Sequence, residues 1–199
     1  MSFGYYASGK VGFTNSVFRF KGVNRSSKEN YKTNFGDGEI FIDFNNAIWD
    51  TGTENAEIYM RKAETVTFNV AEGGLTITNA SGKTFTTTMP FTGEGVLTKS
   101  GDGDLIFGEA LSLVGTSPQY GDSATMTTNA CERTFTLDVT GGLNILGGTV
   151  YVTAETIRPG LDVYIAKGAV LDLGGTTVEF NSIAGAGTVR NGTVKVAKL

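Results

Sequence analysis

Histidine is absent from this chain of 199 residues, and cysteine occurs only once. The lack of histidine removes the commonest general base, the commonest metal ligand and every Ser-His or Cys-His catalytic arrangement. The single cysteine, Cys131, excludes an internal disulfide. These absences predict a protein that is not an enzyme and that needs no cofactor and no metal.

An excess of positive charge is also lacking, because 16 Lys and Arg are outnumbered by 20 Asp and Glu. Binding of nucleic acid needs clustered Lys and Arg in excess, so we expect no nucleic-acid partner. Basic residues do gather near Phe18, Phe20 and Tyr31, and we interpret that stretch as a solvated loop and strand face.

Long apolar runs are missing as well, since no stretch approaches the ~20 apolar residues of a membrane helix. The first residues lack the basic segment and apolar run of a signal peptide. If the protein is exported, we expect its leader and membrane anchor to lie outside this chain.

Proline is scarce at three residues, whereas glycine reaches 28. Flexible linkers raise both residues, while a turn-dense β protein needs mainly glycine. From Glu64 onward, short alternating apolar runs are separated by glycine turns, and no convincing helical stripe interrupts them. This pattern predicts an all-β fold in which brief strands wind into a solenoid.

Alternation and spacing over residues 161–199 predict which side chains face the interior. The inward residues of one coil are Val163 and Ile165, Leu171 and Leu173, and Val178 and Phe180. The next coil supplies Ile183, Val189, and Val194 with Val196, at intervals of 20, 18 and 16 residues. Parallel strands stacked ~4.8 Å apart would place these residues in apolar columns.

Residues 1–62 differ in composition from the rest of the chain. They contain seven of the 13 Phe and the only Trp, but only seven of the 28 Gly. The open end of a solenoid needs a cover to stay soluble. We therefore predict an aromatic-rich N-terminal β cap over residues 1–62 and a parallel β-helix over residues 63–199.

Residues 93–107 read Gly-Glu-Gly-Val-Leu-Thr-Lys-Ser-Gly-Asp-Gly-Asp-Leu-Ile-Phe. This stretch resembles the autotransporter-associated β-strand repeat of bacterial passenger domains, Gly-x-Gly-x-Leu-Thr-Lys-x-Gly-x-Gly-x-Leu. The matching positions are Gly93, Gly95, Leu97, Thr98, Lys99, Gly101, Gly103 and Leu105. The resemblance covers about residues 64–199 and implies a right-handed parallel β-helix that is secreted or held at a bacterial cell surface. The full Leu-Thr-Lys motif occurs only once, which departs from a repeated pattern.

The polar residues 115–133 interrupt the strand rhythm, and we predict that they project sideways as a binding loop. Tyr120 lies within them. Two further tyrosines, Tyr151 and Tyr164, stand between apolar neighbours and are predicted to point outward. Exposed rings stack on sugars or pack across strands, so these three tyrosines are the candidate ligand-binding residues.

Carboxylates suggest two chemical alternatives. Asp102 and Asp104 resemble one calcium-binding turn, but such turns work by repetition, and we interpret this one as a polar turn. Glycan cleavage needs two carboxylates at a set separation, and Asp162, Asp172 and Glu179 are candidate outward residues for it.

The function predicted from the sequence is a non-catalytic, autotransporter passenger-like shaft for display and adhesion. Its expected partner is a glycan or a host or matrix protein. The first alternative is a glycan-active β-helix enzyme, either a polysaccharide lyase or a glycosidase. The second is a β-sandwich carbohydrate-binding module, which antiparallel strand pairing would reveal.

Overall fold

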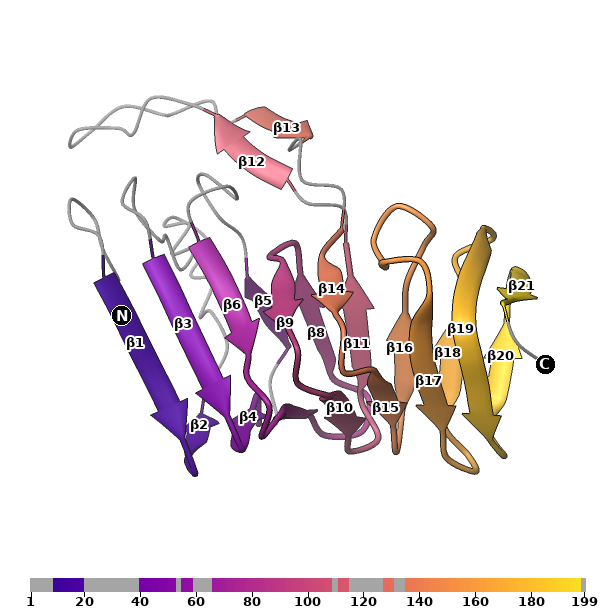
Figure 1. The fold of residues 1–199 in the computed structure, drawn as a ribbon, viewed down its shortest axis with the longest axis horizontal. Helices are drawn as coiled ribbons and strands as arrows, with labels where there is room; N and C mark the ends of the chain where they lie inside the picture. The colour runs from indigo at the N-terminus through magenta and orange to yellow at the C-terminus, as the bar shows by residue number, and fades with distance from the viewer. Residues whose placement is uncertain are drawn as a thin grey trace.

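A computed structural model describes residues 9–19, 40–52, 55–58, 66–108, 111–114, 127–130 and 135–197. The regular elements in these ranges are all strands, so the predicted all-β class is confirmed (Figure 1). No helix in the described part of the chain is long and apolar enough to span a membrane. Every strand pair in the three large sheets is parallel.

The three sheets are named here I, II and III. Sheet I contains β1 (Gly9–Thr14), β3 (Ile40–Asn45), β6 (Val66–Val70), β9 (Phe91–Gly93) and β14 (Leu137–Val139). Sheet II contains β2 (Val17–Arg19), β4 (Ala47–Asp50), β7 (Leu75–Thr78), β10 (Leu97–Ser100), β15 (Leu143–Ile145), β17 (Leu161–Ile165), β19 (Thr177–Gly185) and β21 (Thr193–Val196). Sheet III contains β5 (Ala56–Ile58), β8 (Thr84–Thr87), β11 (Asp104–Phe107), β16 (Thr149–Tyr151), β18 (Val170–Asp172) and β20 (Thr188–Arg190).

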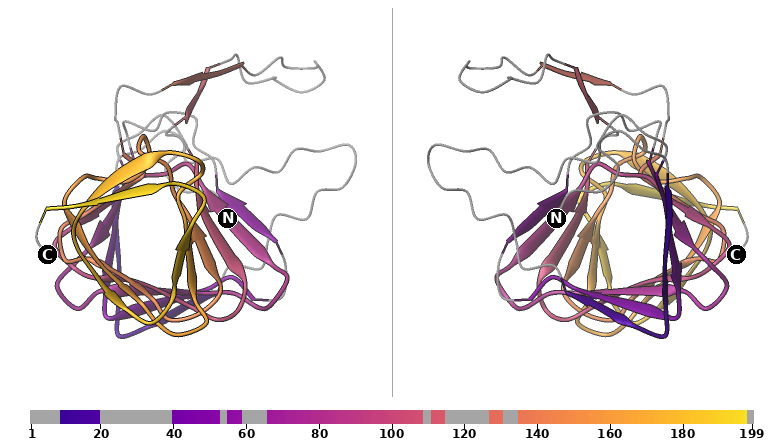
Figure 2. Two further views of the ribbon diagram at one scale, coloured as in Figure 1. Left: turned by 90° about the vertical axis from the view of Figure 1, so that its right-hand side faces the viewer. Right: turned by 90° about the vertical axis from the view of Figure 1, so that its left-hand side faces the viewer.

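From β3 to β11, and again from β14 to β16, the chain visits sheets I, II and III in turn. Strands β17 to β21 alternate between sheets II and III only. One passage around the interior is called a circuit. Strands β6, β7 and β8 form one circuit, and β9, β10 and β11 form the next. Viewed along the stack, the ribbon encloses an interior bounded by the three sheets (Figure 2). The parallel pairing of residues 135–196 contradicts the β-sandwich alternative, which requires antiparallel neighbours.

Strand register confirms the predicted apolar columns. Val163 pairs with Ile183, Leu171 with Val189, Val178 with Val194, and Phe180 with Val196. One detail differs from the prediction, because Val178 and Ile183 belong to a single strand, β19. The first half of β19 pairs with β21 and its second half pairs with β17. One continuous strand, β19, therefore replaces the two strands and intervening corner that were expected.

Aromatic side chains fill the interior near the N-terminal end. The ring centroids of Phe44 and Trp49 are 5.6 Å apart, and Trp49 lies 5.3 Å from Phe85. Phe68 and Phe91 are 5.0 Å apart. Burial of each such ring contributes about 1.5 to 3 kcal/mol, so this cluster is a large part of the core energy.

Strands on the two sides of residue 62 pair directly with one another. Strand β3 pairs with β6, β4 with β7, and β5 with β8. The described parts of residues 1–62 thus contribute strands to the same three sheets as the rest. The division into a cap over residues 1–62 and a β-helix over residues 63–199 stays a prediction.

Strands β12 (Leu111–Val114) and β13 (Thr127–Ala130) form a separate antiparallel ribbon. Both views place this ribbon outside the three sheets (Figures 1 and 2). Strand β13 falls within residues 115–133, which were predicted to project as a loop, and β12 directly precedes them. Tyr120 and Cys131 lie outside the described residues, as do Phe20 and Tyr31 of the basic stretch.

Candidate functional site

The Leu-Thr-Lys motif lies on β10 and places its lysine in the core. Leu97 and Lys99 alternate inward, and Lys99 is 0% exposed. Register sets Lys99 between Ile77 and Ile145 in an otherwise apolar column. Its ammonium turns toward the corner between sheets II and III, where backbone oxygens gather.

Three carbonyl oxygens accept hydrogen bonds from Lys99 Nζ. They belong to Ser100 at 2.6 Å, Gly101 at 2.8 Å and Gly147 at 3.4 Å. Burial lowers the pKa of Lys99 to about 8, although the carboxylates of Asp104 and Asp102 act to raise it. Near neutral pH the motif lysine is therefore a buried cation that binds two successive circuits together.

The motif glycines allow neighbouring circuits to approach closely. A Cβ atom on Gly95 would clash with the carbonyl oxygen of Ala71, and one on Gly103 would clash with that of Ala80. The described residues contain no group of three or more metal-ligating side chains. The negative charges of Asp104 and Asp102 instead act to raise the pKa of Lys99.

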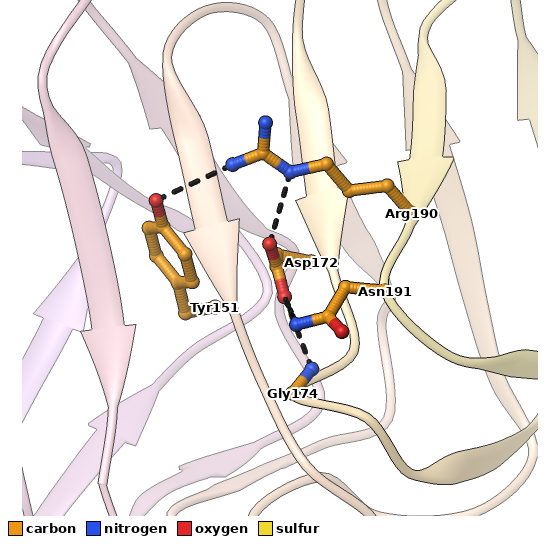
Figure 3. A network of polar contacts seen from close by, with 5 residues as sticks. All are labelled: Tyr151, Asp172, Gly174, Arg190 and Asn191. Atoms are coloured by element: carbon orange, nitrogen blue, oxygen red, sulfur yellow. Dashed lines mark hydrogen bonds and ion pairs between the residues drawn. The ribbon is translucent and has the colours of Figure 1, made fainter.

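Asp172 belongs to a polar network on the outward face of sheet III, where other side chains shield it from solvent (Figure 3). It is 5% exposed, because Arg190 and Asn191 from the next circuit cover it. Arg190 Nε donates to Asp172 Oδ2 at 2.9 Å, and Asn191 Nδ2 donates to Oδ1 at 2.9 Å. The Gly174 amide also donates to Oδ1, at 3.1 Å. Asp172 thus lies on the outward face of sheet III, as predicted, but neighbouring side chains cover it.

Opposing effects set the pKa of Asp172. Burial alone would raise the pKa, but hydrogen bonds from Gly174, Asn191 and Arg190, together with the Arg190 charge, lower it below its usual value. The same contact with Asp172 raises the pKa of Arg190. The pair is therefore ionised at neutral pH, and the carboxylate is occupied by structural contacts.

The candidate tyrosines lie on different sheets. Tyr151 is half-buried on sheet III, and its hydroxyl accepts a 3.5 Å hydrogen bond from Arg190 Nη2 (Figure 3). Tyr164 is 44% exposed on sheet II. Both alternate with buried neighbours, as predicted, but the structure does not bring them together.

The remaining candidate carboxylates are also separated. Asp162 Oδ1 accepts hydrogen bonds from Asn181 Nδ2 at 2.7 Å and Ser182 Oγ at 2.5 Å. Glu179 is exposed and registers with Lys195. No described register places two of the three candidate carboxylates opposite each other.

A line of outward residues on sheet II was missed by sequence reasoning, apart from Tyr164. Its members, called the outer line of sheet II, are Val17, Ile48, Thr76, Thr98, Asn144, Tyr164 and Ala184. The intervals along it are unequal, from 20 residues between Asn144 and Tyr164 to 46 between Thr98 and Asn144. No fixed period in the sequence could reveal the line.

Comparison with known proteins finds no matching family model, no similar curated protein and no similar solved structure.

Proposed function

We propose that this chain is a right-handed parallel β-helix that serves as the rigid shaft of an exported surface protein. The observation that carries the proposal is the repeated return of the chain to three parallel sheets around one apolar interior. Each circuit is hydrogen-bonded to the circuits before and after it, an arrangement that suits a stiff rod. No catalytic role is assigned to it.

The proposed role of the shaft is display and adhesion. The β12–β13 ribbon extends from the sheets between β11 and β14, and it flanks the connecting segment, residues 115–126. Segments that project from a rigid scaffold are the usual carriers of binding. The proposed ligand of this segment is a glycan or a host or matrix protein.

Cellular location follows from the resemblance of residues 93–105 to an autotransporter repeat. We assign the protein to the secreted or cell-surface fraction of a bacterium, as part of a passenger-like domain. Antibodies against the purified chain should label intact cells of the organism that makes it. Labelling only after permeabilisation would contradict the assigned location.

Shortening the connecting segment tests the display role. Val114 and Thr127 are opposite each other in register, so an Asn-Gly turn in place of residues 115–126 joins two already paired strands. The shortened protein should keep its melting temperature and lose binding to immobilised collagen and to the proteins and glycans of a matrix array. A scrambled segment of the same composition is the matched control and should also lose binding.

Equal binding by the full, scrambled and shortened chains would contradict display by this segment. Release of reducing ends or of unsaturated products from any polysaccharide in the array would instead support the glycan-active alternative.

A further inference from the structure

Exposed apolar side chains gather on the outer face of sheet II. Among the side chains that the structure describes, four large hydrophobic ones are exposed: Val17, Ile48, Leu146 and Tyr164. Val17, Ile48 and Tyr164 belong to the outer line of sheet II. Leu146 follows β15 directly, and its amide donates to the carbonyl oxygen of Lys99 on β10. One of the three sheets thus carries this whole set.

The outer line of sheet II contains no charged residue over seven strands. Six strand spacings of about 4.8 Å make it about 29 Å long. Asp50 and Asp162 lie two residues from Ile48 and Tyr164 on their strands, and both accept hydrogen bonds within the chain. The seven residues of the line themselves offer no cation to an anionic ligand.

Polar groups in the middle of the line are available to a ligand. Thr76, Thr98 and Asn144 are partly exposed, and within the described residues their side chains form no hydrogen bond. The outward column of sheet III differs, because Tyr151, Asp172 and Arg190 there bond to one another. Sheet II therefore offers unpaired hydroxyl and amide groups beside apolar surface.

Of a peptide strand, a protein surface and a sugar, the outer line of sheet II is suited to bind a sugar. Strands β4, β7, β10, β15 and β17 pair on both sides, so their backbone groups are not open to an added peptide strand. A stable protein interface needs about 800 Å² from each partner, far wider than one line of mostly short side chains. A sugar ring presents an apolar C–H face and uncharged hydroxyls, which match Tyr164 and the Thr and Asn groups.

We propose that the outer line of sheet II binds an extended, uncharged polysaccharide along the stack. Tyr164 supplies a stacking surface, flanked by Asn144 on one strand and the small Ala184 on the other. Thr98, Thr76 and Asn144 supply hydrogen bonds to hydroxyl groups. The proposal rests on the proposed adhesive function and names its ligand class, but places contact on the shaft in addition to residues 115–126.

Affinity electrophoresis and pull-down against cellulose, chitin and soluble β-glucan test this proposal, with alginate and polygalacturonate as acidic counterparts. The variants are Thr98→Lys and Tyr164→Ala, and Thr86→Lys is the matched control. Thr86 is also a partly exposed outward threonine, but on β8 of sheet III. Melting temperatures establish that each variant folds, and Tyr164→Ala tests the line independently if Thr98→Lys fails to fold.

Wild-type protein should bind at least one neutral polysaccharide with little sensitivity to salt. Thr98→Lys and Tyr164→Ala should each weaken binding about five- to tenfold, while Thr86→Lys leaves it unchanged. Binding should persist in the chain shortened at residues 115–126. Loss of binding in that chain with no effect of Thr98→Lys would overturn this inference and leave the display role standing.

Three other results would also overturn it. They are binding of acidic polysaccharides alone, no binding to any neutral polysaccharide, and equal losses from Thr98→Lys and Thr86→Lys. Sedimentation supplies a further check, because a wild-type dimer that Thr98→Lys dissociates would assign the face to a second copy of this chain and refute polysaccharide binding.

Discussion

Lys99 Nζ donates a 2.8 Å hydrogen bond to the carbonyl oxygen of Gly101, from within a column that also holds Ile77 and Ile145. A charged amine in such a column is tolerated because three backbone oxygens surround it and two carboxylates lie near. Desolvation still dominates, which is why the pKa falls to about 8.

Stability should depend on the protonation of Lys99. Between pH 8 and its ordinary value of 10.5, the unfolded chain binds more protons at this residue than the folded chain does. Its contribution to the free energy of unfolding therefore rises with pH through this window, by up to about 1.4 kcal/mol per pH unit. Below pH 8 both states are protonated, and the cost of the buried charge is fully present.

Denaturant unfolding of wild type and Lys99→Met between pH 7.5 and 9.5 measures this effect. The difference between the two free energies should grow in favour of the wild type as pH rises. Lys195→Met, at an exposed site on β21, is the control and should keep the wild-type pH dependence. Parallel pH profiles for wild type and Lys99→Met would show that Lys99 is not the titrating group.

Substitution of Gly95 by alanine should destabilise the stack. The new Cβ would meet the backbone carbonyl of Ala71, which cannot turn aside without shifting a circuit. We expect a loss of about 1 to 3 kcal/mol in thermal or denaturant unfolding. Gly12→Ala is the matched control, because nothing lies within 4 Å of that Cβ position, and its effect should stay within about 0.5 kcal/mol. Similar losses at both sites would argue against close packing at the corner.

An aspartate at Val189 should disrupt the last circuits. Val189 pairs with Leu171 in an apolar column and is partly buried, so a carboxylate there loses hydration. The expected loss is about 1 to 3 kcal/mol in the free energy of unfolding. Thr188→Asp, one residue earlier on the exposed face of β20, should cost less than about 0.5 kcal/mol. A reversed order would mean that the two faces of β20 are wrongly assigned.

The Asp172 network should stabilise the fold in the ionised form of its carboxylate. Because the folded-state pKa of Asp172 is lowered, its contribution is present above the ordinary carboxyl pKa and is lost as pH falls through the folded-state pKa. Asp172→Asn should therefore lower the melting temperature at pH 7 and flatten the acid limb of the stability profile. An unchanged acid limb would assign that titration to other carboxylates. Asp138, whose partly exposed carboxylate lies 3.5 Å from Arg158, offers the matched Asp138→Asn control, with a smaller effect.

Alternation and interval predicted the columns at Ile183, Val189 and Val194, because the last circuits are short and nearly equal in length. The same alternation puts Lys99 on the inward side with Leu97. Charged side chains generally prefer water, which argues against an inward lysine. The inward position of Lys99 is stabilised by backbone carbonyl oxygens at the corner, and these come together only in the folded chain.

The sequence could not show what covers Asp172 or what lines sheet II. Arg190 and Asn191 cover Asp172 from the next strand, which only the register reveals. Thr98 and Asn144 become neighbours across 46 residues, since the β12–β13 ribbon lies between them in the chain. Such contacts depend on how many residues separate two paired strands, and the composition of the chain does not give that number.

The pairing of β9 with β14 has a consequence for how this molecule can diversify. Phe91 registers with Leu137, 46 residues later, whereas Phe68 registers with Phe91 after only 23. Strands β9 and β14 thus pair directly in sheet I, although the β12–β13 ribbon is inserted between them in the sequence. The segment inserted between β11 and β14 can therefore change in sequence or length during evolution while the three sheets stay the same. Recognition and stability are then free to evolve separately.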